Sequence, residues 1–383
     1  MRVLLSSTRG SGHFAPLLPF ARAFLRAGHE VLAAGPPDLK GAVDAAGLEY
    51  WAFDPPADEE LGPVWARVPT LSPEEANRVV IGEIFGRLNS SSALPRLKQA
   101  CEKWAPDVVL RESAEFGSAI AAELHGVAHA RVATGLSSTE AMTLFFAAPA
   151  LDALRKEAGL PPDLDAGVLR RSPFLTMFPA ALEDPGVSAQ PHTLRFADPE
   201  WHDGAAELPD WWEGAAGPLV YVSFGSVAGA MEMAAEAYRA AIDAMAGVDA
   251  RVLLTVGREA DPDAFATVAP NVHLEPWVPQ TDVLAHAAVV VCHGGSGTTL
   301  GALAAGLPQV LVPLFADQPL NAGRVAAAGA GLSVATEAGA IRSAVEEVLI
   351  ESRFRERAGE IAAEMSAQPP ADKAVAELER LAA

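Results

Sequence analysis

The chain has 383 residues, half of them hydrophobic, and a formal net charge of −21. This length and apolar content predict two domains with sizeable cores. The negative charge argues against nucleic acids and anionic membrane surfaces as partners, because both bind clustered lysine and arginine. The sequence contains no apolar run of membrane-spanning length and no visible signal peptide. We therefore expect no stable membrane insertion and a cytoplasmic location.

The N-terminal half opens with a βαβ pattern. A strand at Val3–Ser7 leads through the polar glycine loop Thr8–His13 into a helix at Ala15–Ala27, and a second strand follows at Val31–Ala34. Apolar residues recur every three to four positions in the helix, which predicts one buried face. Further strands are expected at 108–110 and 128–132, with a helix at 116–124 between them. Such alternation is typical of a parallel sheet.

Two stretches interrupt this alternation. Residues 54–95 carry several prolines, and residues 136–149 carry several large apolar side chains. We expect inserted, partly helical loop regions there, and long loops with exposed aromatics in an α/β domain often form binding walls.

The alternation restarts after a linker at 198–218. Strands are expected at 219–223, 251–256, 272–274, 287–291 and 309–313, and a helix at 232–246. Residues 342–383 are expected to be helical with a break at Pro369-Pro370. The predicted division is an N-terminal domain at 1–205, a second domain at 218–365, and a C-terminal helix at 366–383 that packs back on the first domain.

The segment Cys292–Leu300, Cys-His-Gly-Gly-Ser-Gly-Thr-Thr-Leu, joins a predicted strand to a predicted helix. Glycine lets backbone approach a ligand, and a helix N-terminus offers unpaired N–H groups and a positive dipole end. Together they predict a pyrophosphate cradle. Trp277-Val278-Pro279-Gln280 lies upstream, and Asp317-Gln318 follows a later strand.

The glycine loop ending in His13, the Trp277-x-Pro279-Gln280 motif, His293-x-Gly295 and Asp317-Gln318 occur in this order. Their arrangement resembles the family 1 glycosyltransferases of the GT-B fold, most closely the bacterial branch that decorates polyketide and other antibiotic aglycones. The resemblance covers the whole chain. It implies an α/β fold of two Rossmann-like, doubly wound parallel-sheet domains that face each other across a cleft.

The resemblance also implies roles for donor-site residues. Trp277 would stack on the nucleobase, with the Val278 backbone at the edge of the base, and His293 would donate to a pyrophosphate oxygen. The Asp317 carboxylate and the Gln318 amide would hydrogen-bond to sugar hydroxyls. The full set of expected donor-binding residues is Ser226, Trp277, Val278, Gln280, His293, Gly295, Ser296, Gly297, Thr298, Asp317 and Gln318.

One departure from the plant members concerns the donor. Those proteins have a glutamate eight residues after the motif histidine that binds both ribose hydroxyls, but Gly301 stands at that position here. A site without this hydrogen-bond-accepting glutamate depends less on a ribose 2′-hydroxyl for binding. We therefore expect a dTDP-sugar as co-substrate, with a UDP-sugar as the alternative. No cofactor is expected, and the sequence offers no clustered metal-ligand motif.

His13 is the expected general base, because a neutral imidazole has suitable basicity near neutral pH. It would take the proton of an acceptor hydroxyl in a single displacement that inverts the anomeric centre. Glu112, just after the strand at 108–110, is the preferred residue for orienting His13, with Ser113 and Glu115 as alternatives. The acceptor is expected to be an apolar natural product held by aromatic and flexible walls around Trp65, Phe85, Met142, Phe145 and Phe146.

Three other functions are weighed against this one. A nicotinamide oxidoreductase is disfavoured, because Gly10-x-Gly12 is followed by Ala15 where the dinucleotide fingerprint has glycine. A lipid-linked sugar transferase of GT-B fold and a non-catalytic nucleotide-sugar-binding partner stay as alternatives. The sequence leaves the sugar, the aglycone, O- versus N- or C-transfer and the oligomeric state open, a homodimer included.

Overall fold

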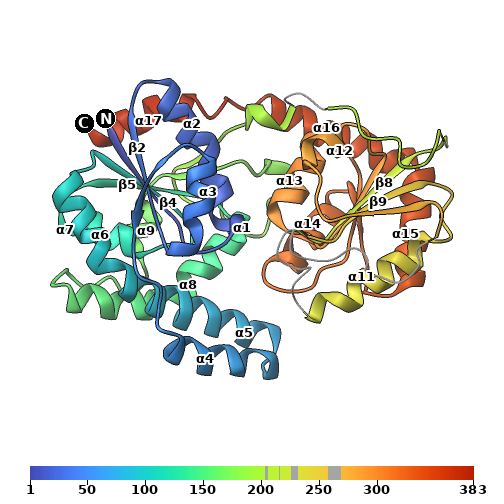
Figure 1. Ribbon diagram of the computed structural model, residues 1–383. Coiled ribbons are helices and arrows are strands. Elements are labelled where there is room, and N and C mark those ends of the chain that lie inside the picture. The colour runs from blue at the N-terminus through green and yellow to red at the C-terminus, as the bar shows by residue number, and fades with distance from the viewer. Residues whose placement is uncertain (203–205, 215, 226–231, 258–268) are drawn as a thin grey trace. The chain divides into compact units, whose positions relative to one another are not determined.

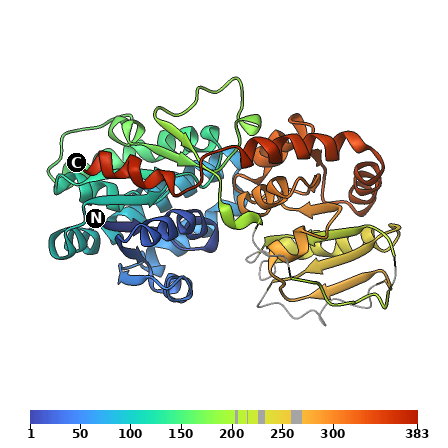
Figure 2. The same cartoon turned by 90° about the horizontal axis from the view of Figure 1, so that it is seen from above.

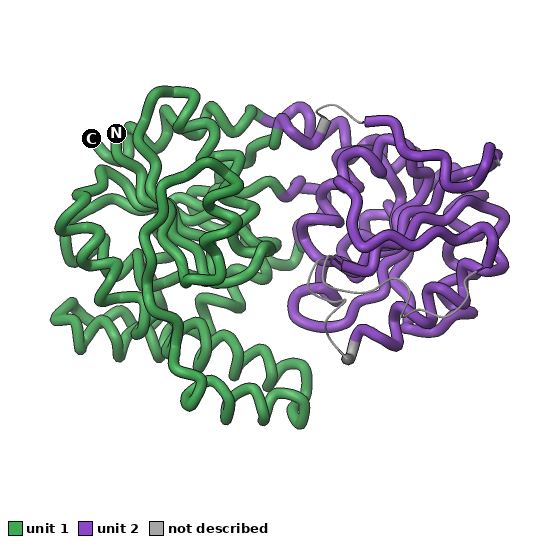
Figure 3. The backbone as a smooth tube through the Cα atoms, in the orientation of Figure 1, with its two compact units in different colours: residues 1–177, 184–198, 369–383 green, residues 178–183, 199–368 purple. Residues whose placement is uncertain are grey.

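The computed structural model describes residues 1–202, 206–214, 216–225, 232–257 and 269–383. The chain forms two compact units (Figure 3). Unit 1 comprises residues 1–177, 184–198 and 369–383, and unit 2 comprises residues 178–183 and 199–368. Each unit is built on one parallel sheet (Figure 1).

Unit 1 has a seven-stranded sheet in the order β3-β2-β1-β4-β5-β6-β7. Its order reverses between β1 and β4, which pair directly, with Ser6 opposite Arg111. Ligands of open α/β sheets bind outside the carboxyl ends of the strands at such a point. The strands are β1 Arg2–Ser6, β2 Glu30–Gly35, β3 Glu49–Ala52, β4 Val108–Glu112, β5 Ala128–Val132, β6 Phe174–Thr176 and β7 Thr193–Arg195.

Helices cover both faces of this sheet, and β1 shows how. Successive strand residues point to opposite faces. Val3 and Leu5 pack with residues of α2, α3 and α17, whereas Leu4 packs with residues of α6, α7 and α8. The helices of unit 1 are α1 Ser11–Phe14, α2 Leu18–Arg26, α3 Lys40–Ala45, α4 Asp58–Arg67, α5 Pro73–Val79, α6 Ser90–Trp104, α7 Gly117–Leu124, α8 Ser137–Glu157, α9 Gly167–Arg171 and α17 Lys373–Ala382.

The C-terminal helix α17 lies against α2 in unit 1 (Figures 1 and 2). Its apolar side chains, among them Val375 and Leu378, join the core that contains Val3 and Leu5. The Arg26 guanidinium forms two hydrogen bonds of 2.9 Å with the Asp372 carboxylate just before the helix. The end of the chain thus completes the core of the unit that contains its beginning.

Unit 2 has a six-stranded sheet in the order β10-β9-β8-β11-β12-β13, and its order reverses between β8 and β11. Its strands are β8 Leu219–Ser223, β9 Arg251–Thr255, β10 Val272–Glu275, β11 Val289–Cys292, β12 Gln309–Leu311 and β13 Gly331–Ser333. Its helices are α11 Glu232–Met245, α12 Gln280–Leu284, α13 Ser296–Ala304, α14 Gln318–Ala327, α15 Ala338–Ile350 and α16 Ser352–Ser366.

Two sequence-based expectations about helices are corrected by the structure. The helix expected at 15–27 is present, but it consists of a 3₁₀ turn at Ala15–Leu17 and α2, and α1 precedes it, so that His13 lies in a helical turn and not in a loop. Pro16 and Pro19 each stand at the start of a new segment, where a missing N–H is tolerated. The segment 136–149, expected as a partly helical loop region, is the first part of the 21-residue helix α8.

The stretch 54–95 is also more helical than expected. After α4 and α5, residues Val80–Asn89 form a π-helix, η4, that runs directly into α6. The η4 glycines pack closely on α8. A Cβ on Gly82 would lie 3.1 Å from the Phe146 carbonyl oxygen, and a Cβ on Gly86 would lie 3.2 Å from the Ala147 Cα. Small residues therefore let this wide helical turn pack against its neighbour.

Candidate functional site

The loops after β1 and β4 bring His13 and Glu112 together at the point where the strand order of unit 1 reverses. His13 Nδ1 lies 3.1 Å from Glu112 Oε2. The carboxylate is fully buried, whereas about a quarter of the His13 side chain is exposed (27%). The pair therefore combines a buried charge with an imidazole that solvent or a ligand can reach.

Glu112 is held by several hydrogen bonds. The Thr8 N–H and hydroxyl donate to Oε1 at 3.2 and 2.7 Å, and the Ala114 N–H donates to Oε2 at 2.6 Å. Burial by itself raises the pKa of Glu112, but the charge of His13 and the hydrogen bonds from His13, Ala114 and Thr8 outweigh it, so the pKa is lowered. The side chain is accordingly a carboxylate at neutral pH, fixed against His13.

The two alternative partners of His13 have other roles. The Ser113 hydroxyl donates to the Val132 carbonyl at 3.1 Å. Glu115 accepts hydrogen bonds from the Ser118 N–H and hydroxyl at the start of α7. Burial raises the pKa of Glu115.

Arg111 fixes the course of the loop that carries Glu112. Its fully buried Nη1 donates to the carbonyl oxygens of Glu112, Ser113 and Glu115 at 3.0–3.1 Å. This residue was not predicted from the sequence. The available signal was an arginine directly after the apolar run 108–110, because a charge at the end of a buried strand needs partners.

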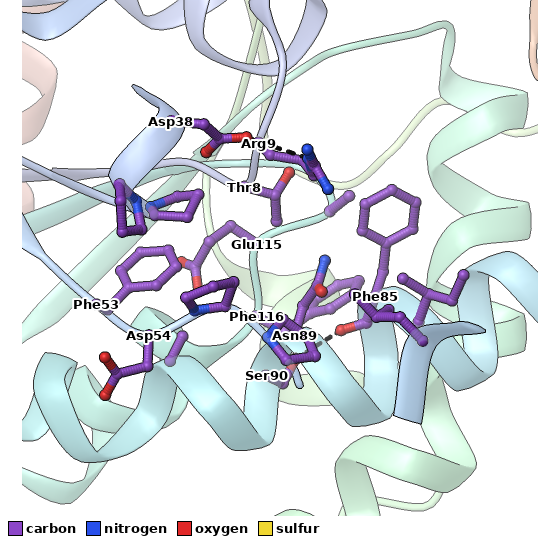
Figure 4. Close-up of a pocket in the computed structure, with 18 of the residues that line it drawn as sticks. Thr8, Arg9, Asp38, Phe53, Asp54, Phe85, Asn89, Ser90, Glu115 and Phe116 are labelled. Carbon is purple, nitrogen blue, oxygen red and sulfur yellow. Dashed lines mark hydrogen bonds and ion pairs between the residues drawn. The ribbon is translucent and has the colours of Figure 1, made fainter. Parts of the chain in front are cut away.

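A cavity of about 370 Å³ lies beside this pair, wholly within unit 1 (Figure 4). Its walls come from the loops after β1, β2, β3 and β4, from α4, from η4 and from the start of α6. They include the expected Trp65 and Phe85, together with Phe53, Phe116 and several prolines. The Phe85 ring also lies 5.4 Å from the His13 imidazole, centroid to centroid, so it connects the cavity to the pair.

The other three expected wall residues do not line this cavity. Met142 and Phe146 lie on α8 and pack, partly buried, against the core of unit 1. Phe145 is 68% exposed and its ring lies 5.4 Å from that of Phe146. The sequence predicts a partly helical loop region at 136–149, whereas the helix α8 turns these side chains in different directions.

In unit 2, the strand–glycine turn–helix expected around Cys292–Leu300 is present as β11, Gly294-Gly295 and α13. Gly294 has φ +85, and a Cβ there would lie 3.0 Å from the Gln318 carbonyl oxygen. Gly295 is the N-cap residue of α13, and no side chain caps the helix. Ser296, Gly297 and Thr298 form its first turn, where backbone N–H groups lack intrahelical partners.

His293 sits between two glycines. A Cβ on Gly225 would lie 3.0 Å from its Cε1, and a Cβ on Gly295 would lie 2.4 Å from its Nε2. Gly225 follows β8 with φ +82, so the imidazole lies where the strand order of unit 2 reverses. Burial lowers the pKa of His293 to about 4, and the ring is neutral at neutral pH.

A hydrogen-bond network joins α13 to α14. Asp317 Oδ2 accepts from the Ser296 hydroxyl at 3.2 Å and from Asn321 Nδ2 at 3.0 Å. Asn321 also donates to the Gly294 carbonyl at 2.9 Å, and Gln318 Oε1 accepts from the N–H groups of Leu314 and Phe315. Asn321 was not predicted; its spacing of four residues from Asp317 at a helix start was the usable signal.

Trp277 is 45% exposed after β10, so it is not a core residue. Val278 is half-buried, and Gln280 begins α12 and donates to the Thr298 hydroxyl at 3.1 Å. A Cβ on Gly301 would lie 3.3 Å from Gln280 Oε1. Ser226, the remaining expected donor residue, lies outside the described residues.

The described part of the chain contains no group of three or more His, Cys, Asp or Glu residues that could hold a metal ion. None of its helices has both the length and the apolarity that a membrane span requires.

Comparisons with known proteins agree with this architecture. Residues 22–218 match the family model of the erythromycin biosynthesis protein CIII-like N-terminal domain, and residues 239–381 match the model of the corresponding C-terminal domain. An L-demethylnoviosyl transferase of Streptomyces niveus is 32% identical over 87% of this chain and 85% of its own length.

Two solved structures resemble the whole chain. The glycosyltransferase SnogD from Streptomyces nogalater is 25% identical with a TM-score of 0.76, and the match covers 100% of this chain and 99% of that one. The spinosyn rhamnosyltransferase SpnG, solved with thymidine diphosphate, is 21% identical with a TM-score of 0.80, over 99% and 100% of the two chains. The expected GT-B fold is thereby confirmed.

Proposed function

We propose that the chain moves a sugar from a dTDP-sugar to a hydroxyl group of an apolar aglycone with inversion of the anomeric configuration. The premise is that the chain belongs to the erythromycin biosynthesis protein CIII-like family of natural-product glycosyltransferases. In this proposal His13 is the general base, Glu112 holds it, and unit 2 binds the dTDP-sugar.

The His13–Glu112 pair carries the proposal. Nδ1 of His13 faces a buried carboxylate at 3.1 Å, so Nε2 is the nitrogen assigned to the acceptor hydroxyl. A carboxylate in this place fixes the tautomer and steadies the imidazolium that forms. Phe85 lies against the same imidazole and lines the adjoining cavity, which supports that cavity as the acceptor site.

The reaction is one displacement. A lone pair of the acceptor oxygen forms the bond to the anomeric carbon, while the bond from that carbon to the diphosphate oxygen breaks and its electrons leave with the diphosphate. The proton of the hydroxyl passes to His13 Nε2. Because attack comes from the face opposite the leaving group, the anomeric configuration inverts.

The leaving diphosphate gains negative charge during this step. The N–H groups of the first turn of α13 and the neutral imidazole of His293 are the assigned stabilising groups. Fixed donors of this kind act without reorganising during the reaction. Trp277, exposed beside α12, is assigned to the nucleobase.

The preference for dTDP follows from Gly301. This residue brings no carboxylate to the ribose, and the space next to it is occupied by the Gln280 amide, which is bonded to Thr298. The structure of SpnG in complex with thymidine diphosphate is consistent with this assignment.

The test is transfer by the purified protein with the dTDP- and UDP-forms of the same hexose and a panel of phenolic and macrolide acceptors, followed by mass spectrometry. We expect the dTDP-form to be favoured about 10-fold or less in kcat/KM, because one hydrogen bond is at stake. NMR of the product reports the anomeric configuration. A UDP preference would contradict the donor assignment, retention would contradict the mechanism, and dTDP binding without hydrolysis or transfer would indicate a non-catalytic partner.

A further inference from the structure

We infer that Asn89 selects the acceptor by hydrogen-bonding a carbonyl or hydroxyl group of the aglycone that is separate from the hydroxyl that reacts. The inference rests on the proposed role of the unit 1 cavity as the acceptor site. It defines the acceptor as a molecule with an apolar body and two polar groups, one at His13 and one at Asn89.

The first support is that the other polar side chains lining the cavity are already bonded to protein groups or are exposed. The Thr8 hydroxyl is bonded to Glu112, the Ser90 hydroxyl donates to the Phe85 carbonyl at 2.8 Å, and Glu115 is bonded to Ser118. At the rim, Arg9 pairs with Asp38 at 3.2 Å, and both are largely exposed. Asp54 and Asp58 are exposed as well.

Asn89 differs from all of these. Its side chain is half-buried, lines the cavity and forms no hydrogen bond with any residue that the structure describes. Figure 4 shows it among the aromatic side chains, with its amide pointing into the space. An amide has two donor hydrogens and an acceptor oxygen, and leaving them unpaired when an apolar ligand displaces water costs free energy.

The second support is the position of Asn89 on η4. It follows Phe85 by four residues, slightly less than one turn of a π-helix, and both side chains line the cavity. Phe85 contacts the His13 ring, and Asn89 is thus displaced from the catalytic pair by about one turn. A flat aglycone on Phe85 would reach His13 with one polar group and Asn89 with another.

This geometry explains why the Asn89 amide discriminates between acceptors with and without a second polar group. A site built to hydrogen-bond a substrate group rejects an analogue without that group, because the buried amide stays unpaired. A purely apolar wall would lack this effect, since it would bind both molecules through the same surface.

The experiment measures binding of two flavonoids by isothermal titration calorimetry. 7-Hydroxyflavanone and 7-hydroxyflavan have the same reacting phenol and differ by one ring carbonyl. We expect the wild-type protein to bind the flavanone about 10-fold more tightly, the range of one hydrogen bond to a buried amide. Asn89→Leu should bind the two with equal affinity.

Asn77→Leu is the matched control, because Asn77 lies on α5 and does not line the cavity. It should keep the wild-type preference. An unchanged preference in Asn89→Leu, no preference in the wild-type protein, or binding of neither flavonoid would each overturn the inference. Failure of the proposed function is seen separately, as a lack of hydrolysis or transfer with every dTDP-sugar, an assay that does not depend on Asn89.

Discussion

Both units carry a histidine at the point where the strand order of their sheet reverses, yet the two imidazoles have different neighbours. In unit 1, His13 follows β1 and faces the buried Glu112 carboxylate, which comes from β4. In unit 2, His293 follows β11 and faces Gly225, which comes shortly after β8. The same sheet architecture therefore gives one imidazole a negative partner and the other only backbone.

The difference suits two tasks. A histidine beside a carboxylate can accept a proton and hold the resulting charge. A histidine buried between glycines resists protonation, as the pKa of about 4 for His293 indicates. Its neutral ring has one N–H, which interacts with the Ser223 backbone here and would have to turn to a diphosphate oxygen when the donor binds. We interpret His13 as a proton acceptor and His293 as an uncharged donor to a diphosphate.

The largest expected effect comes from removing the first imidazole. His13→Ala should lower kcat by roughly 10²–10⁴-fold, the usual contribution of general base catalysis. Affinity for dTDP, measured by calorimetry, should stay unchanged because unit 2 is intact.

His125→Ala controls for the loss of a histidine in unit 1. His125 lies 3.6 Å from Glu102, so it also has a glutamate neighbour, but it lines no part of the described cavity. Turnover by this variant should be near that of the wild type. If His13→Ala retained comparable turnover, His13 would have no place in the mechanism.

The next effect comes from neutralising the partner. Glu112→Gln should lower kcat by about 10–100-fold, the range seen when an outer carboxylate that orients a functional histidine is changed in metalloenzymes. The amide NH₂ must also face the N–H of Thr8 or Ala114, which costs some stability. Steady-state kinetics beside a thermal melt separates the two effects, and Glu102→Gln is the control.

The pH dependence of stability tests the same carboxylate. Since folding lowers the pKa of Glu112, its contribution is present above its ordinary value of 4.5 and is lost as pH falls through the folded value. Chemical denaturation should therefore show a smaller loss of stability below pH 4.5 in Glu112→Gln than in the wild type. Equal losses would indicate that the charge of Glu112 contributes little to folding.

The sequence contained the information for these two sites because their signals are local or follow from topology. The glycines of 294–297 stand next to His293, and the carboxyl ends of parallel strands meet at one edge, which brings Glu112 to His13. The pairing of β1 with β4 could be inferred from a doubly wound pattern without knowledge of any contact.

The walls of the cavity were predictable only in part. The prolines of residues 54–95 suggested loops, but α4 and α6 continue through Pro63 and Pro95, and α8 likewise continues through Pro149. The π-helical turn that presents Phe85 and Asn89 depends on the close approach of Gly82 and Gly86 to α8, a long-range contact. Met142 and Phe146, expected at the same wall, do not line the described cavity and are partly buried against the core.

The smallest effect concerns the space around His293. Gly295→Ala places a methyl group 2.4 Å from Nε2, so the imidazole must turn away from its position beside the start of α13. Because Gly295 has φ −64, the backbone itself tolerates alanine. We expect affinity for dTDP, measured by calorimetry, to fall by about 10-fold, the value of one charge-assisted hydrogen bond. Gly323→Ala in α14 is the matched control, since a Cβ there meets nothing within 4 Å, alanine favours a helix, and Gly323 is not among the expected donor-binding residues. Unchanged dTDP affinity in Gly295→Ala would remove His293 from the diphosphate site, and the contrast between the two histidines would then concern packing alone.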